Sequence, residues 1–168
     1  MNSVQTRTAI LDEGAVQRKI KRMALEVAEQ NAGEKELIIA GINGNGVTVA
    51  HCIADELKNL AGMQVQVITI QLNKREPSEV SLQPSIEIKD RVVVITDDVA
   101  NTGKTMFYAL KPFLHSSPRK IQTLVLVERS HKQFPIQTDY TGLSIATTLQ
   151  EHISVETEGN KILGASLH

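Results

Sequence analysis

The sequence lacks the features that mark secreted or membrane-spanning proteins. Its 168 residues include a single cysteine, Cys52, so no disulfide can form within the chain. No apolar run reaches the length of about 18 residues that a membrane-spanning helix needs. The first ten residues also lack the apolar centre of a secretory signal. These absences predict a cytoplasmic protein that has no membrane as a partner.

The sequence also lacks an excess of positive or negative charge. The formal net charge is −1, which gives no whole-chain reason to expect nucleic acid as a partner, although a local basic face remains open. Hydrophobic residues make up 41% and charged residues 22%, which are ordinary values for a globular protein. The length predicts one domain over residues 1–168 with room for a hydrophobic core.

Short apolar segments alternate with amphipathic segments along the chain. Asp12 is a typical helix N-cap, and apolar residues at spacings of three and four predict a helix from there to near Gly33. Helices are also predicted over residues 47–60 and 104–115, and Pro112 is expected to bend or shorten the latter. Apolar runs predict strands over residues 36–42, 64–72, 91–96 and 121–127. The tail holds strand-like pieces (SIATT and KILGASL) that suit a sheet edge or a small flap.

This alternation predicts an α/β fold with a mainly parallel central sheet flanked by helices. Such sheets bind ligands beyond the carboxyl ends of their strands. Three polar segments fall there: NGNG (43–46), a long loop (73–85) and DDVANTGKT (97–105). The long loop contains two prolines and no periodicity. It is therefore expected to be a flexible lid or binding loop, with a plain solvated connection as the alternative.

The segment DDVANTGKT combines carboxylates with a helix start. Residues 102–105 open the predicted helix, whose free amides suit a phosphate group, and Gly103 allows close approach of the backbone. A nucleotide-binding P-loop needs a glycine where Asp98 stands, so that hypothesis is weak. Two carboxylates would repel a facing phosphate, so Asp97 and Asp98 suit hydroxyl groups or a metal. A ribose 5-phosphate fits both the carboxylates and the helix start. The alternative is that the two aspartates are only a polar strand end and Thr102 only a helix cap.

The segment NGNG allows two interpretations. Its consecutive amides can form an anion-binding nest, or the segment can be a tight turn between strand and helix. Two anion sites at neighbouring strand ends favour a ligand with phosphates at both ends.

VVVITDDVANTGKT (92–105) resembles the 5-phosphoribosyl 1-pyrophosphate (PRPP) motif of type I phosphoribosyltransferases. Residues 10–31, 37–42 and 126–148 are similar to PyrR proteins, bacterial pyrimidine-operon attenuators that also act as uracil phosphoribosyltransferases. The resemblance implies transfer of ribose 5-phosphate from Mg²⁺-bound PRPP to a nucleobase, with uracil favoured, and release of pyrophosphate. It also implies a homo-oligomer, and Mg²⁺ that is held by PRPP and water without a protein ligand cluster.

The resemblance further assigns roles to residues. Asp97 and Asp98 are expected to hold the ribose hydroxyls. The 5-phosphate loop comprises Val99, Ala100, Asn101, Thr102, Gly103, Lys104 and Thr105. The pyrophosphate loop comprises Asn43, Gly44, Asn45 and Gly46, with Lys74 and Arg75 of the hood loop 73–85 as further contacts. The base pocket comprises Glu128, Arg129, Tyr140 and Thr141, where Tyr140 is expected to stack on the base; a tyrosine packed in the core is the alternative.

The sequence departs from this pattern at several positions. Asn43 and Asn45 stand where PyrR proteins usually have a lysine and an arginine, so stabilisation of the leaving pyrophosphate is expected to be weaker. Restoring the cation by Asn45→Arg is therefore expected to raise turnover. Asn101 and Glu128 argue against hypoxanthine or guanine as the base. The alternative function is a catalytically weak regulator that binds PRPP or a nucleotide and possibly RNA.

A basic face for RNA is the last hypothesis. Arg18, Lys21 and Arg22 lie on the first predicted helix, and His131 and Lys132 follow the fourth strand. Together they could contact RNA phosphates. A solvated helix face is the alternative explanation.

Overall fold

The computed structural model describes residues 6–168, so residues 1–5, half of the segment tested for a secretory signal, lie outside the described residues. Its elements are β1 (Thr8–Leu11), α1 (Glu13–Gln30), β2 (Glu36–Ile42), α2 (Asn45–Ala61), β3 (Gln64–Leu72), β4 (Val80–Gln83), β5 (Val92–Ala100), α3 (Lys104–Ala109), the 3₁₀ helix η1 (Lys111–Phe113), β6 (Lys120–Arg129), β7 (Tyr140–Ile145), β8 (Ile153–Glu158) and β9 (Lys161–Leu167). Over residues 6–168, no helix is long and apolar enough to cross a bilayer.

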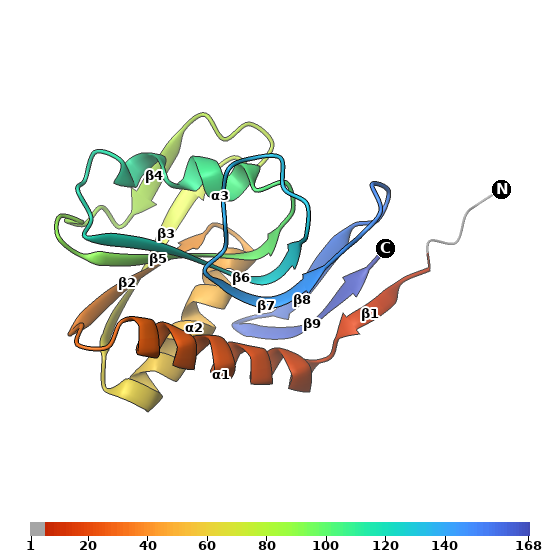
Figure 1. Ribbon diagram of the computed structural model, residues 1–168, viewed down its shortest axis with the longest axis horizontal. Coiled ribbons are helices and arrows are strands. Elements are labelled where there is room, and N and C mark those ends of the chain that lie inside the picture. The colour runs from red at the N-terminus through yellow and green to blue at the C-terminus, as the bar shows by residue number, and fades with distance from the viewer. Residues whose placement is uncertain (1–5) are drawn as a thin grey trace.

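The central sheet has the strand order β4-β3-β2-β5-β6-β7, and only β4 runs antiparallel to its neighbour. Helices α1 and α2 cover one face and α3 the other (Figure 1). Alternate side chains of β2 explain its unbroken apolar run: Leu37 and Ile39 pack in the core under α1 and α2, while Ile38 and Ala40 pack in the core under α3. The predicted α/β fold with a mainly parallel sheet is confirmed.

Helix α1 begins where the sequence predicts. The Asp12 side chain accepts a hydrogen bond from the Ala15 amide at 2.7 Å, which satisfies one of the free donors at the helix start. The helix ends at Gln30, a few residues earlier than predicted. Buried Asn31 ends it by donating from Nδ2 to the Val27 carbonyl at 2.8 Å. Its inward stripe of apolar residues is completed by Val16, Ile20, Met23 and Ala24.

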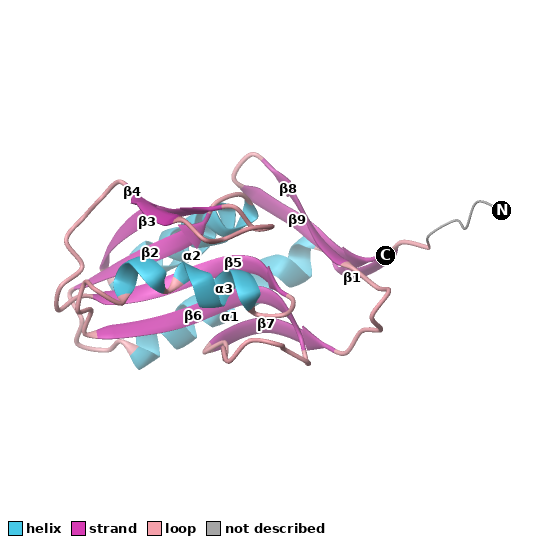
Figure 2. Cartoon of the chain, turned by 90° about the horizontal axis from the view of Figure 1, so that it is seen from above, coloured by secondary structure: helices cyan, strands magenta, loops and turns pink. Residues whose placement is uncertain are grey.

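A second, antiparallel sheet of order β1-β9-β8 lies beyond the end of the central sheet (Figure 2). Strand β1, which was not predicted, pairs with β9 through Thr8 and Leu167. The predicted piece KILGASL forms β9, so it belongs to the small flap. SIATT instead overlaps the end of β7, at the edge of the central sheet. Both of the predicted locations for tail strands are therefore used.

Three of the boundaries that differ from prediction have their cause in strand pairing or chain stiffness. Strand β5 continues to Ala100 because it keeps pairing with β6, which places Asp97 and Asp98 inside the strand. Residues 80–83 of the predicted loop form β4, paired with β3, so the irregular part is shorter than predicted. Helix α3 ends at Ala109 and η1, which contains Pro112, follows; the predicted shortening is confirmed.

Candidate active site

A cavity of about 240 Å³ lies at the carboxyl end of β5. It brings together the predicted carboxylate pair, the predicted 5-phosphate loop and one residue of the predicted hood loop. Its lining consists of Lys74, Asp97, Asp98, Val99, Ala100, Asn101, Thr102, Gly103, Lys104, Thr105, Met106 and Ile153. Tertiary structure thus gathers β5, α3, β8 and the loop after β3 around one space.

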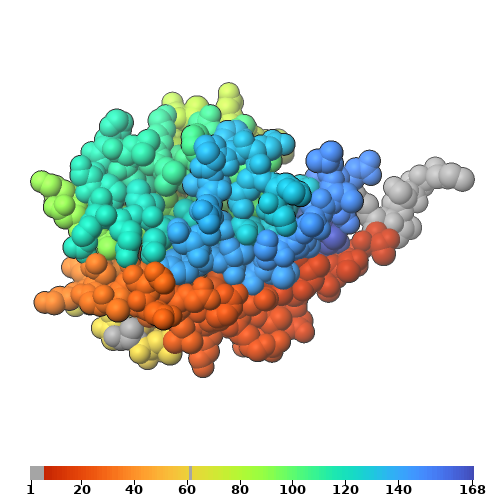
Figure 3. Space-filling view, viewed as in Figure 1, coloured from red at the N-terminus to blue at the C-terminus, as the bar shows by residue number. Residues whose placement is uncertain are grey.

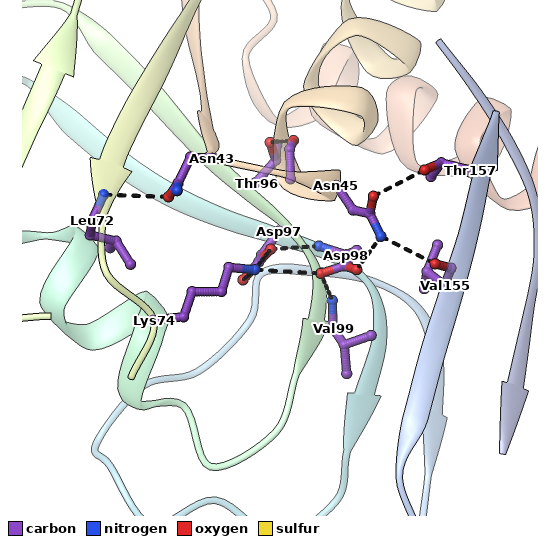
Figure 4. Close-up of polar contacts among 11 residues, drawn as sticks. Asn43, Asn45, Leu72, Lys74, Thr96, Asp97, Asp98, Val99, Val155 and Thr157 are labelled. Carbon is purple, nitrogen blue, oxygen red and sulfur yellow. Dashed lines mark hydrogen bonds and ion pairs between the residues drawn. The ribbon is translucent and has the colours of Figure 1, made fainter. Parts of the chain in front are cut away.

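The two carboxylates occupy different environments. Asp97 is only 2% exposed, whereas Asp98 is half-buried. Burial, together with the negative charge of Asp98, raises the pKa of Asp97 to about 7, even though the positive charge of Lys74 acts to lower it. Lys74 Nζ lies 3.1 Å from Asp97 Oδ1 and 3.9 Å from Asp98 Oδ1 (Figure 4). Near neutral pH Asp97 can therefore gain or lose a proton.

Backbone amides fix the orientation of both carboxylates. The Asp98 amide donates to Asp97 Oδ1 at 2.9 Å, and the Val99 amide donates to Asp98 Oδ1 at 2.9 Å. Asp98 Oδ2 receives a further hydrogen bond from Asn45 Nδ2 at 3.0 Å. The carboxylates are thus held at the strand end, with one oxygen of each in contact with a local amide.

The predicted 5-phosphate loop is supported from behind by the segment that follows β6. The Thr102 carbonyl accepts hydrogen bonds from the amides of Gln133 and Phe134 at 2.8 and 3.1 Å. Gly103 has φ of +85°, and a side chain there would lie 2.5 Å from Ile136 Cγ2. The Thr102 hydroxyl accepts from the Lys104 amide at 3.2 Å. The loop therefore has a fixed shape that requires glycine at its turn.

The asparagines of the predicted pyrophosphate loop contact protein atoms. Asn43 Oδ1 accepts from the Leu72 amide at 3.3 Å, which ties the loop to β3. Asn45 lies in the first turn of α2 and contacts Asp98 and β8. None of residues 43–46 lines the cavity described above. Pyrophosphate binding by this loop stays a prediction, and the side chains of both asparagines are engaged elsewhere.

The structure places Tyr140 away from the cavity, so its predicted stacking on the base is wrong. Tyr140 begins β7 opposite Leu124 of β6, whereas the cavity lies at the other end of these strands, where Ala100 is opposite Glu128. Its buried ring packs in the core under α1, and its hydroxyl donates to Gln122 Oε1 at 2.9 Å. Burial raises the pKa of Tyr140 to about 12. The alternative of a packed tyrosine with a satisfied hydroxyl is the one found.

Thr141 is engaged away from the cavity as well. Its carbonyl accepts from Arg22 Nη2 at 3.0 Å, and its hydroxyl lies 2.8 Å from that of Thr138. Ile153, the first residue of β8, is an apolar lining residue that comes from the second sheet, and sequence reasoning missed it. A lone isoleucine in EHISV carries no signal of its own, because only the return of the second sheet brings it to the cavity.

Glu128 and Arg129 sit beside the cavity without lining it. Although burial acts to raise the pKa of Glu128, hydrogen bonds from Lys132 at 2.7 Å and Thr138 at 2.5 Å bring it below its usual value. Arg129 Nη1 donates to Asn101 Oδ1 at 3.1 Å, and its Nη2 donates to the Thr148 carbonyl at 2.7 Å. Arg129 therefore orients the amide of Asn101, which does line the cavity.

The predicted basic face is divided between two sides of the sheet. Arg22 on α1 donates to the carbonyls of Thr141 and Gly142 and pairs with Glu26. Lys132 pairs with Glu128, in the segment that packs behind the 5-phosphate loop on the α3 side. Helix α1 runs along one border of the molecule (Figure 3). The residues of the predicted face, Arg18, Lys21, Arg22, His131 and Lys132, thus come from two separate segments, and RNA binding stays a prediction.

Comparison with known proteins agrees with the geometry. A family model described as phosphoribosyl transferase domain matches residues 6–158, and the chain belongs to this family. It is a type I phosphoribosyltransferase by fold. It is 36% identical to the bifunctional protein PyrR of Clostridium acetobutylicum over 163 residues, which cover 91% of this chain and 92% of that protein. It is also 36% identical to the bifunctional protein PyrR of Staphylococcus epidermidis over 159 residues, covering 89% and 91%.

Solved structures share the fold at much lower identity. The hypoxanthine phosphoribosyltransferase of Trypanosoma cruzi superposes with a TM-score of 0.76 at 17% identity, covering 94% of this chain and 95% of that chain. A hypoxanthine-guanine phosphoribosyltransferase from Bacillus anthracis gives a TM-score of 0.71 at 18% identity, covering 82% of each chain. The resemblance to the phosphoribosyltransferase family, and to the PyrR proteins within it, is confirmed.

Proposed function

We propose that the chain transfers ribose 5-phosphate from Mg²⁺-bound PRPP to a nucleobase, with uracil favoured, and releases pyrophosphate. The observation that carries the proposal is the contrast of chemistry inside one cavity. Asp97 and Asp98 line it together with the loop from Asn101 to Thr105. Carboxylates accept hydrogen bonds from sugar hydroxyls. The free amides at a helix start, together with threonine hydroxyls, donate hydrogen bonds to a phosphate.

The reaction requires little chemistry from side chains. A base nitrogen forms a bond to the anomeric carbon, the bond to pyrophosphate breaks with its electron pair, and the proton of the nitrogen passes to water or to the departing pyrophosphate. The developing positive charge on the sugar lies near the carboxylates, which stabilise it electrostatically. Lys74, whose contact with the carboxylates is broken when the sugar binds, then supplies a positive charge for the pyrophosphate. Arg75 contributes from the exposed side of the same loop.

The residues present fit a magnesium ion that arrives with the substrate. Within residues 6–168, no group of three or more His, Cys, Asp or Glu side chains is spaced to hold a metal by itself. Mg²⁺ usually keeps several waters and binds through substrate phosphates with one or two carboxylates. The ion would thus be held by PRPP and water, and Asp97 and Asp98 would stay free to accept the ribose hydroxyls.

The preference for uracil rests on Asn101 and on the PyrR relatives. Arg129 has only donors, so the Asn101 atom that it contacts must be the amide oxygen. The amide NH₂ of Asn101 is therefore the group available to a base, and it donates to a carbonyl oxygen such as those of uracil. Asn101 cannot remove a proton, in contrast to a carboxylate at this position. The aliphatic Ile153 offers an apolar surface for a base in the same cavity.

A second candidate function is a weak or inactive regulator that binds PRPP or a nucleotide. The observation in its favour is the engagement of Asn43 and Asn45 with Leu72, Asp98 and β8. Neither side chain carries a charge, so this loop adds no cation for a leaving pyrophosphate. Binding would survive this loss better than turnover.

The first experiment measures pyrophosphate release from Mg²⁺-PRPP with uracil, hypoxanthine, guanine, xanthine, adenine and orotate in parallel. Turnover with uracil that disappears in the Asp97→Asn, Asp98→Asn double variant is the expected result. Binding of PRPP without turnover on any base would favour the regulator. A chain that neither binds PRPP nor turns over would contradict both candidate functions.

A further inference from the structure

The side chain of Asn45 joins three parts of the molecule. Its Nδ2 donates to Asp98 Oδ2 at 3.0 Å and to the Val155 carbonyl of β8 at 3.1 Å. Its Oδ1 accepts from the Thr157 hydroxyl at 3.1 Å, also on β8 (Figure 4). Asn45 itself begins α2, so helix, carboxylate and second sheet meet at one amide.

The partners dictate the orientation of this amide. A carboxylate and a backbone carbonyl accept hydrogen bonds only, so the atom that faces both of them must be the NH₂ group. The Thr157 hydroxyl can donate, and it does so to the remaining oxygen. Both hydrogens of the NH₂ group are thereby used. A cationic or apolar residue of any length would lose at least one of these contacts.

The backbone holds Asn45 in place from the other side. The Thr96 hydroxyl donates to the Gly46 carbonyl at 2.9 Å in a buried setting. A side chain on Gly46 would lie 2.9 Å from the Thr96 carbonyl and 3.1 Å from Asp97 Oδ1. Glycine at this position therefore lets the start of α2 press against the end of β5, which brings the Asn45 amide within reach of Asp98.

We propose that Asn45 is a positioning residue for the sugar: it orients the Asp98 carboxylate and locks it to β8, and it does not contact pyrophosphate. The proposal rests on the proposed function, because it deepens the role of the same site. With Oδ1 of Asp98 bonded to the Val99 amide and Oδ2 bonded to Asn45, the carboxylate plane is fixed. Its remaining acceptor positions are then presented to a ribose hydroxyl in one orientation.

Three probes separate sugar positioning from pyrophosphate contact. Mg²⁺-PRPP carries sugar, 5-phosphate and pyrophosphate; ribose 5-phosphate lacks pyrophosphate; inorganic phosphate, measured by competition, reports on the 5-phosphate loop alone. Binding of each is measured for the wild type, Asn45→Ala and the matched control Thr157→Val. Thr157→Val removes the contact to Oδ1 and leaves the bond between Asn45 and Asp98 intact.

We expect Asn45→Ala to weaken PRPP and ribose 5-phosphate by the same factor of about ten, the loss typical of one hydrogen bond to a charged group. Inorganic phosphate should bind as before, and Thr157→Val should change none of the three by more than about twofold. Weaker binding of PRPP alone would overturn the proposal, because Asn45 would then contact pyrophosphate. Equal loss for all three probes, or no loss, would overturn it too.

A wild-type chain that binds neither PRPP nor ribose 5-phosphate would refute the proposed function itself. That outcome is distinct from those above, which all require binding by the wild type. Melting temperatures of both variants, measured alongside, show whether equal loss for all probes comes from a damaged fold.

Discussion

The two loops that follow β2 and β5 occupy equivalent positions and use their side chains in opposite ways. Both connect a buried parallel strand to a helix, and both contain glycine with positive φ, at Gly44 and Gly103. In the first loop, Asn43 and Asn45 contact protein atoms. In the second, the loop and the adjoining ends of β5 and α3, residues 97–105 together, line the cavity. Residues 43–46 are therefore named the clamp, because their side chains bind protein atoms. Residues 97–105 are named the receptor loop, because they line the candidate ligand site.

The two loops have similar positions in the fold but different roles. The sequence makes both loops appear suited to phosphate, because both are polar and rich in glycine or small residues. The second sheet decides between them: β8 supplies the Val155 carbonyl and the Thr157 hydroxyl, and these partners engage the Asn45 amide. At the cavity the second loop meets Ile153 of that sheet, which has no polar side-chain group to engage Asn101, Thr102, Lys104 or Thr105.

The largest expected effect comes from disabling the receptor loop. Replacing both Asp97 and Asp98 with Asn should weaken PRPP binding by more than about a hundredfold, because two charge-assisted contacts to the sugar are lost. Calorimetry with Mg²⁺-PRPP measures the loss, and circular dichroism checks that the variant is folded. Unchanged affinity in a folded variant would remove these residues from the site.

The substitution Asn45→Arg adds a cation to the clamp and tests whether this loop can bind ligand. The family pattern by itself predicts that Asn45→Arg raises turnover, whereas the contacts of Asn45 predict a fall in kcat/KM of about tenfold. The arginine would lose the hydrogen bond from Thr157 and pair with Asp98, which removes that carboxylate from the sugar. Steady-state kinetics with Mg²⁺-PRPP and uracil decide between them, and a gain would show that the loop can serve as a receptor.

The proton on Asp97 should make binding depend on pH. Its pKa is raised to about 7 by burial and by Asp98, and the hydroxyl-accepting form is the ionised one. PRPP affinity should therefore rise by up to about tenfold between pH 6 and pH 7.5 and then level off. Since Lys74 acts to lower this pKa, Lys74→Met should move the midpoint upward. A midpoint that stays in place would contradict the role of Lys74 as counter-ion.

The same carboxylate should carry a cost in stability. Because the folded pKa is raised from the ordinary value of 3.8 to about 7, stability from Asp97 is fully present below 3.8 and is lost as pH rises through 7. Asp97→Asn should raise the melting temperature by a few degrees at pH 8 and by less at pH 5. Thermal unfolding at the two pH values measures it, and a gain that does not depend on pH would point to another cause.

The smallest expected effects are changes in the free energy of unfolding on replacing Gly44 or Gly46, the glycines of the clamp. Gly46→Ala forces a side chain against the Thr96 carbonyl and should destabilise the fold by about 2 kcal/mol. Gly44 has φ of +90° and ψ of −137°, a backbone conformation open almost only to glycine, so Gly44→Ala should cost about 1–3 kcal/mol from strain although a methyl group would meet open space. Urea unfolding measures both variants, and a Gly46→Ala variant as stable as the wild type would mean that α2 does not start tightly against β5.

Much of the fold was predictable because it follows from local pattern. Strands β2 and β3 begin and end where predicted, since an apolar run between polar or glycine-rich ends is a local feature. The carboxylate pair and the TGKT segment were found for the same reason. Strand β1 was missed because four residues at a flap carry little pattern, and β5 was too short because its polar end pairs with β6.

The sequence by itself determined the order of the main helices and parallel strands and the chemistry concentrated in residues 97–105, because hydrophobic period and residue type act over short distances. Only the tertiary structure decided that Tyr140 lies at the end of β7 away from the cavity and that Ile153 lines the cavity. It also decided that Asn45 donates a hydrogen bond to Asp98. Those outcomes depend on strand register and on the return of β8, which join residues that lie far apart in the sequence. A hydrogen-bonding side chain has no fixed role until its partners are placed, and the fold places them.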